Sequence, residues 1–200
     1  MRIAILTGVA GLAFAAAACN SNQPDNGISA DANLAGDPAA NDVLGANAMT
    51  DNEAATAMPT DANGFATAVA ASDLYEIESS RLALSKGTST EVKEAAGHIQ
   101  TDHQKSTAEL KTAASQAQVT VTPALDAEKQ AMLDQLKAAN GAEFDRLYLQ
   151  QQKTAHQKAL ALLQSYAQGG DAEPLKAFAK KASGVVQGHI EHLNGIKQPS

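Results

Sequence analysis

The sequence predicts an all-α fold, an up-down antiparallel four-helix bundle with an extra short helix between the second and third long helices. Small and apolar residues recur every three or four positions along four long segments, which is the pattern of helices with one buried face. The chain contains no tryptophan and only 4% aromatic residues, which suits a core of closely packed helices. Because the connections between long segments are short, we expect antiparallel neighbours.

The clearest buried stripe runs through residues 92–117. Its members are Val92, Ala96, Ile99, His103, Ser106, Leu110, Ala113 and Ala117. Thr88–Glu91 before it resembles a capping box, in which the first and fourth side chains satisfy free backbone N–H groups. The stripe is apolar or small except at its histidine, so one imidazole is expected inside the bundle.

The remaining helices follow from the same periodicity and from helix-stop signals. We expect helices over about Ala62–Lys86, from an Asp126 cap to Ala138, over about Ala142–Gln168, and from an Asp171 cap to Ile196. Asn140-Gly141 predicts a break between the short helix and the third long one.

Residues 1–18 are predicted to be a lipoprotein-type signal peptide. Arg2 gives a positive start, an apolar run follows, and small residues precede Cys19, the only cysteine. Cys19 is the expected lipid attachment site. The alternative is an ordinary signal peptide cut near Ala18. Asn20, instead of aspartate, follows the cysteine and favours the periplasmic side of the outer membrane by analogy with enteric lipoprotein sorting.

Residues 19–61 are predicted to be a disordered acidic tether, and residues 62–200 the bundle domain. The tether has seven acidic residues and no lysine or arginine, so it accounts for most of the chain's formal charge of −7. It has too few large apolar residues to offset the entropy of ordering. Since the chain has no run rich in Lys or Arg, we expect no nucleic-acid partner.

Each of the four long stripes carries one potential metal ligand. These residues are Glu76, His103, His156 and His189. If the third long helix begins near Gly141, level with the end of the second, all four lie within roughly 12 Å along the bundle axis. A single straight helix from Asp126 to Gln168 would displace His156 by roughly 22 Å. The predicted cluster therefore depends on the break at Asn140-Gly141.

Three imidazoles and one carboxylate suit a single zinc, iron, manganese or copper ion. The stripes lack the Glu-x-x-His pairs of di-iron bundles, which argues against a dinuclear carboxylate site. The alternative is that these histidines are core residues hydrogen-bonded to neighbouring helices.

Four further side chains lie near the predicted site. His98 and His192 are expected at the surface or its boundary. Asp73, one turn before Glu76, is an alternative carboxylate, and Asp102 is either solvated or orients an imidazole of another helix.

The motifs together resemble a bacterial family, the domain of unknown function 4142. The matching residues are Phe65–Ala71 leading to Glu76, Leu82–Leu84, Asp102-His103, Gly141–Asp145 with Tyr148, His156, Phe178-Ala179 and His189. This resemblance implies a ferritin-like bundle over about Ala62–Ile196 and a location in the cell envelope, with no established activity.

The sequence therefore favours an envelope-tethered bundle that binds one metal ion for metal handling or stress protection. The second hypothesis is a structural or partner-binding bundle with hydrogen-bonded core histidines. An enzyme, such as a ferritin-like oxidase or catalase, ranks third, because the sequence indicates neither an open metal position nor substrate access.

Overall fold

The computed structural model describes residues 58–197, and these form five helices. Their bounds are α1 Ala62–Lys86, α2 Thr90–Gln116, α3 Ala127–Ala138, α4 Gly141–Gly169 and α5 Glu173–Gly195. The bounds predicted for the first helix are confirmed. The predicted signal peptide, Cys19 and nearly all of the predicted tether lie outside the described residues.

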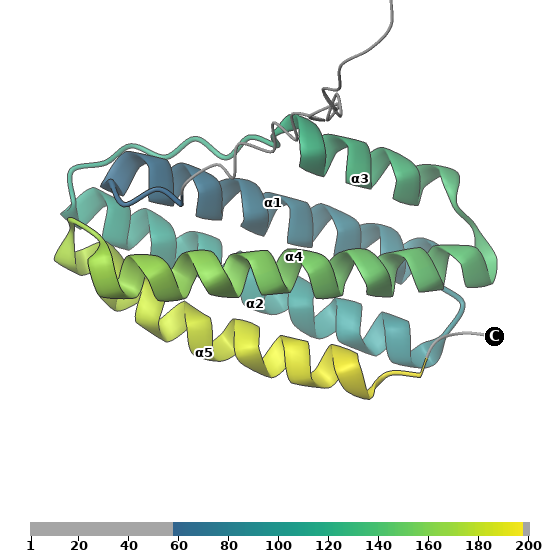
Figure 1. Ribbon diagram of the computed structural model, residues 1–200. Helices are drawn as coiled ribbons and strands as arrows, with labels where there is room; N and C mark the ends of the chain where they lie inside the picture. Colours follow the sequence, from purple (N-terminus) through teal and green to yellow (C-terminus); the bar gives the residue numbers. More distant parts are fainter. Residues whose placement is uncertain (1–57, 198–200) are drawn as a thin grey trace, which may run out of the picture. The chain divides into compact units, whose positions relative to one another are not determined.

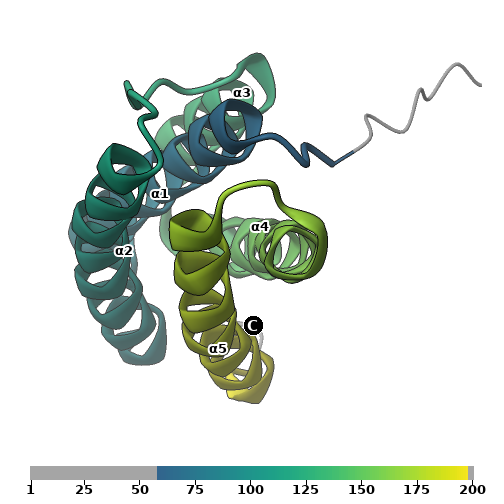
Figure 2. The same cartoon turned by 90° about the vertical axis from the view of Figure 1, so that its left-hand side faces the viewer.

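The four long helices form a bundle, and the short helix lies on its outside (Figure 2). Around the bundle the order is α1, α2, α5, α4: α1 packs on α2, α2 on α5, α5 on α4, and α4 on α1. Helix α3 contacts α1 and α4. The all-α bundle with an extra short helix is thus confirmed.

The path of the chain differs from the simplest up-down arrangement. Figure 1 shows that α2 and α4, the second and third long helices, run in the same direction and are joined by a crossover that contains α3. The side chain of Asp145, near the start of α4, accepts a hydrogen bond from the backbone N–H of Thr88 at the α1–α2 turn. Helix α4 therefore begins level with the start of α2, and the expectation that it begins level with the end of α2 is wrong. Helices that are neighbours around the bundle remain antiparallel.

One of the three predicted helix caps is confirmed, and two differ in the structure. Asp126 caps α3 as expected, through its side chain and a backbone N–H of the first turn. The cap of α2 is Ser89, one residue later than the box expected over Thr88–Glu91. Asp171 does not cap α5. Its carboxylate accepts a hydrogen bond of 2.9 Å from the Tyr166 hydroxyl instead.

The predicted break between α3 and α4 is confirmed. Gly141 has φ +60°, a backbone conformation that glycine adopts with little strain. Asn140, the residue before it, is extended and stands at the N-cap of α4. These two residues reverse the chain, so that α4 returns along the bundle beside α1.

The core consists of two apolar clusters with a buried polar layer between them. The first cluster surrounds Phe65, Tyr166 and Phe178. The second surrounds Tyr75 and Phe144. In α2, α4 and α5 the residues of the polar layer fall between those of the two clusters, and in α1 Asp73 and Glu76 flank Tyr75 at the edge of the second cluster. The layer contains Asp73, Glu76, His103, Gln152, His156 and His189. The fold therefore brings buried titratable groups to the middle of the bundle.

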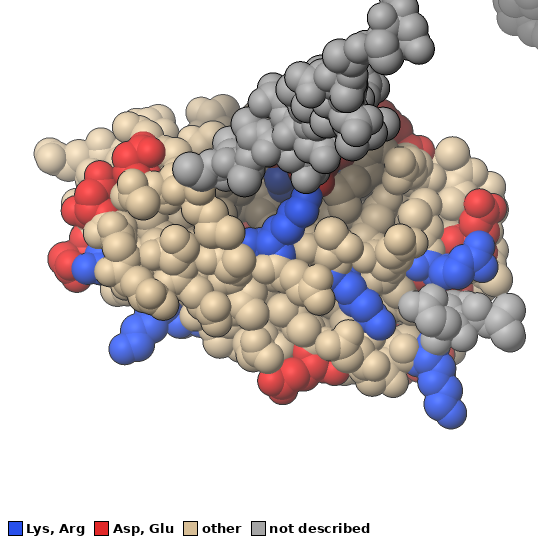
Figure 3. Space-filling model, viewed as in Figure 1, with Lys and Arg blue, Asp and Glu red and all other residues tan. Residues whose placement is uncertain are grey.

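The surface of the described region is mixed in charge. On the face seen in Figure 3, basic and acidic side chains are interspersed among uncharged ones. Among the helices of residues 58–197, none combines the length and apolar character that a membrane span requires.

Candidate metal centre

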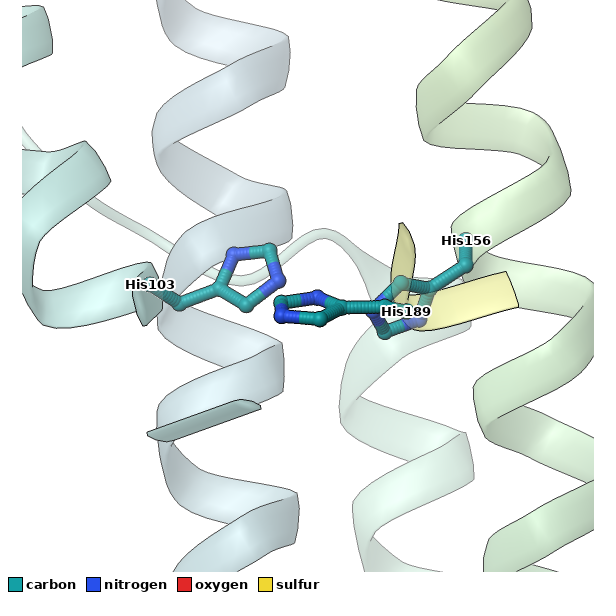
Figure 4. Close-up of side chains that lie close together, drawn as sticks. All are labelled: His103, His156 and His189. Carbon is teal, nitrogen blue, oxygen red and sulfur yellow. The ribbon is translucent and has the colours of Figure 1, made fainter. Parts of the chain in front are cut away.

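Three of the four predicted ligands converge in the polar layer. His103 extends from α2, His156 from α4 and His189 from α5, and their rings point toward one another (Figure 4). One nitrogen from each ring lies within 4.8 Å of the others. All three are buried, and His189 is the most exposed at 9%. Helical periodicity places each histidine on the inner stripe, and the bundle sets their common height.

Each imidazole donates one hydrogen bond away from the point where the rings meet. His103 Nδ1 donates to Asp73 Oδ1 at 2.8 Å, and His189 Nε2 donates to Asp102 Oδ2 at 2.9 Å. His156 Nδ1 donates to the backbone carbonyl of Gln152 at 2.9 Å. Carboxylate and carbonyl oxygens accept hydrogen bonds, so these partners determine which ring nitrogen carries the proton.

The remaining ring nitrogens face the centre. They are His103 Nε2, His156 Nε2 and His189 Nδ1. His156 Nε2 and His189 Nδ1 lie 3.2 Å apart. His103 Nε2 is buried and has no hydrogen-bond partner among the described residues. In the tautomers that these acceptors favour, His156 Nε2 and His189 Nδ1 both lack a proton, so their lone pairs face each other unless a proton or a metal ion lies between them.

Glu76 lies beside the centre, at the other edge of His156. Its Oε1 is 3.6 Å from His156 Nδ1, the nitrogen that faces away from His189. Glu76 is not one of the converging donors. Both of its carboxylate oxygens are buried and lack a hydrogen-bond partner within the described part of the chain. A nearby positive charge stabilises the charged form of a buried carboxylate that has no hydrogen bond.

The protonation of the cluster follows from burial and from the neighbouring charges. Burial, together with the nearby His103 and His189, lowers the pKa of His156 to about 3. Burial also lowers the pKa of His189, against the hydrogen bond to Asp102. Two of the three imidazoles are therefore neutral at pH 7, as metal ligation requires.

His103 and Glu76 behave differently. Burial alone would lower the pKa of His103, but its hydrogen bond to Asp73 and the charge of Glu76 raise it above the ordinary value. Burial raises the pKa of Glu76 to about 7, while the charge of His103 acts in the opposite direction. A proton bound in the layer therefore belongs to His103 or Glu76, and a metal ion would compete with it.

The donor set fits a transition metal ion. Two nitrogens bound to one tetrahedral ion at about 2.0–2.1 Å lie about 3.4 Å apart. The 3.2 Å between His156 Nε2 and His189 Nδ1 is close to that spacing. Metal-bound histidines commonly donate their other N–H to a carboxylate or a backbone carbonyl, which orients the ring and increases its basicity. All three imidazoles have such a partner.

The structure also places the four secondary candidates. The prediction that Asp102 orients an imidazole of another helix is confirmed by its bond to His189. Asp73 orients His103 in the same way. His98 and His192 are exposed, as expected. The role of the Gln152 carbonyl was not predicted, although its place four residues before His156, one helical turn, is a local signal for such a bond.

Comparison with known proteins identifies one family. The family described as "Domain of unknown function (DUF4142)" has a model that matches residues 47–196. No curated protein and no solved structure has significant similarity to the chain. The match covers all five helices and the whole histidine cluster.

Proposed function

This chain belongs to the DUF4142 family, and we propose that its bundle binds one transition metal ion at His103, His156 and His189. The observation that carries the proposal is the direction of the hydrogen bonds. Three acceptors hold N–H groups outward, and the three other ring nitrogens meet inside a buried layer, where those of His156 and His189 are unprotonated at pH 7. Such an arrangement is costly in an apolar core unless a cation occupies its centre.

Three imidazoles with an adjacent carboxylate suit zinc, iron, manganese or copper. The three histidines hold the ion, and Glu76 either becomes its fourth ligand or offsets its charge from beside His156. When bound, the ion would offset the charge of the Glu76 carboxylate, which has no hydrogen-bond partner among the described residues, and would accept the lone pairs of the inward ring nitrogens. It would also connect α2, α4 and α5 at mid-height, where apolar packing is interrupted.

We place this metal-binding bundle in the bacterial envelope. The support comes from the sequence: an apolar run and small residues before Cys19, followed by an acidic stretch without basic residues. In this proposal Cys19 carries the lipid that anchors the chain to the periplasmic side of the outer membrane. The domain then serves metal handling or stress protection outside the cytoplasm.

A second candidate is a structural or partner-binding bundle with hydrogen-bonded core histidines. The observation in its favour is that each imidazole already has one hydrogen-bond partner. This candidate accounts for the outward N–H groups. It does not account for His103 Nε2 or for the two Glu76 oxygens, all buried and without a partner among the described residues.

Replacement of His156 by leucine separates the two candidates. If the histidine only fills the core, leucine restores an apolar stripe, and the metal chelator EDTA changes neither protein. If it is a ligand, EDTA should lower the thermal midpoint of the wild type and leave His156→Leu unmoved. The linked stabilisation is about 4 kcal/mol at a thousandfold excess of free metal over Kd. Thermal midpoints after metal loading, with and without EDTA, measure this difference.

The matched control is Gln157→Leu, which makes the same kind of replacement at an exposed position of α4. It should respond to EDTA as the wild type does. Elemental analysis of the untagged protein identifies the ion and its stoichiometry. A wild-type midpoint unmoved by complete metal removal would reject the metal site and leave the structural bundle.

A further inference from the structure

A surface hollow between α2 and α5 adjoins the histidine cluster. It has a volume of about 260 Å³. Its lining is Ala95, His98, Ile99, Asp102, His189 and His192. His189 therefore belongs both to the buried cluster and to the wall of the hollow. The hollow therefore reaches the candidate metal centre on its His189 side.

Every histidine of the chain lies at one of these two places. The chain has five histidines, and the two outside the cluster, His98 and His192, both line the hollow. They are exposed, and their ring centroids are 6.5 Å apart, compared with 5.2–5.6 Å within the buried cluster. Exposed histidines are ordinarily solvated side chains without a further role. Their position opposite each other, over the route to a third imidazole, calls for a more specific explanation.

Potential metal ligands line the hollow from two helices. On α2, His98 and Asp102 are one turn apart, and on α5 His189 and His192 are one turn apart. Imidazole and carboxylate groups both bind transition metal ions. The Asp102 side chain is 43% exposed, so its negative charge is accessible to cations from solvent.

His189 connects the hollow to the cluster. Its Nε2 donates to Asp102 on the wall of the hollow, and its Nδ1 faces His156 Nε2 inside. A metal ion held next to Asp102 is thus one imidazole away from the inner lone pairs. Among the three buried rings, His189 is also the least covered.

We propose that the hollow is a loading site, where His98, His192 and Asp102 capture a divalent transition metal ion before it passes beside His189 to the inner cluster. This proposal rests on the metal site proposed above. The transfer exchanges one set of ligand lone pairs for another: bonds from the ion to His98, His192 and Asp102 break, and bonds to His103, His156 and His189 form. No electron is transferred, and the ion keeps its charge.

The test compares zinc transfer in three proteins, each the full untagged chain with Cys19→Ser so that no thiol binds zinc. They are the wild type, His98→Gln/His192→Gln, and Gln104→Ala/Gln187→Ala. The last is the matched control, because it alters exposed glutamines on the same two helices. Stopped-flow mixing of the metal-free protein with a coloured zinc–chelator complex measures uptake, and excess chelator measures release.

A loading site predicts a specific kinetic result. The histidine double variant should bind one zinc ion with wild-type equilibrium affinity, while uptake and release both slow by at least tenfold. The glutamine control should match the wild type. Wild-type rates in the histidine variant would overturn the loading site and leave the inner metal site intact. Weaker equilibrium binding caused by faster release would also overturn it, because it would place the outer histidines in the final site.

A second measurement examines the hollow when the inner site is disabled. In a His156→Leu background, Cu²⁺ should still bind weakly and show imidazole nitrogen couplings by electron paramagnetic resonance. Adding His98→Gln/His192→Gln should abolish that signal, and its persistence would contradict the proposal. A wild-type protein that binds no zinc at all would instead reject the inner site on which the proposal rests.

Discussion

Asp145 is expected to be the most sensitive single position outside the histidine cluster. It lies near the start of α4, is fully buried, and accepts hydrogen bonds from the α1–α2 turn. The backbone N–H groups of Thr88 and Ser89 donate to it at 3.1 and 2.8 Å, and the Thr88 hydroxyl also donates. One carboxylate thus joins the start of α4 to the turn that begins α2.

The cost of removing this carboxylate can be worked from its partners. In Asp145→Ala the Thr88 hydroxyl can turn to water, because Thr88 is exposed. Two backbone N–H groups then face a small void, and a buried donor without a partner costs about 1–3 kcal/mol. Partial access of water to the turn lowers the sum, so we expect a loss of about 2–4 kcal/mol. Small domains have a total stability of only about 5–15 kcal/mol.

Asp145→Asn refines the expectation. The amide keeps the shape and one acceptor oxygen but loses the charge that strengthens the bonds to the turn. Its loss should be smaller, about 1–2 kcal/mol. Asp134→Ala on α3 is the control, since its ion pair with Lys137 is solvent-exposed and worth at most about 1 kcal/mol.

Urea unfolding followed by far-ultraviolet circular dichroism measures all three variants at one pH. The expected order of stability is Asp134→Ala, then Asp145→Asn, then Asp145→Ala. If Asp145→Ala unfolded at the same urea concentration as Asp134→Ala, the carboxylate would not hold the turn, and the reasoning would be refuted.

Three further predictions concern the site and the backbone. The pKa of His156 is lowered from 6.5 to about 3, with burial as the main cause. Between these pH values the unfolded chain binds a proton that the folded chain does not. The wild type therefore loses stability as the pH falls through this range. The pKa of Glu76 is raised from 4.5 to about 7, so protonation of Glu76 stabilises the folded chain as the pH falls between those values. The quantity to compare is therefore the pH dependence of the free energy of unfolding in metal-free wild type and in His156→Leu. In urea unfolding at pH 6 and pH 5, the wild type should lose up to about 1.4 kcal/mol per pH unit more than the variant, and parallel pH profiles would contradict this. Asp73→Asn should weaken metal binding by roughly 10–100-fold, because His103 loses its charged hydrogen-bond acceptor. Competition with a chelator measures the affinity. An unchanged affinity would show that this hydrogen bond does not strengthen metal binding. Gly141→Ala should destabilise the chain by about 1 kcal/mol because Gly141 has a positive φ. Gly188→Ala, at an exposed position within α5, should stabilise it by about 0.5–1 kcal/mol. Thermal midpoints that do not shift in opposite directions would refute the backbone argument.

The sequence predicted the helices because their signals are local. Stripe periodicity located the four long helices, and Gly141, the one glycine with positive φ among residues 58–197, marked the break on which the cluster depended. Caps were less predictable. Asp171 has the right residue type and position for a cap, yet the Tyr166 hydroxyl from the preceding helix donates to it instead. A competing partner brought by tertiary packing therefore outweighed a local preference.

The direction of α4 could not be read from the stripes, because an amphipathic pattern is the same whichever way a helix runs. The expected height of His156 was nevertheless close to the observed one. His156 lies near the middle of α4, so starting the helix at either end of the bundle leaves it at about the same level.

By itself, the sequence determined the helices, their inward faces and the presence of one imidazole on each of three stripes, since these depend on spacing along a single helix. Only the tertiary structure decided how the side chains meet. It paired Asp73 with His103 and Asp102 with His189, and it placed Glu76 at the far edge of His156. These contacts join residues 30 to 87 positions apart, and they depend on helix rotation and side-chain rotamer, which periodicity along one helix does not specify.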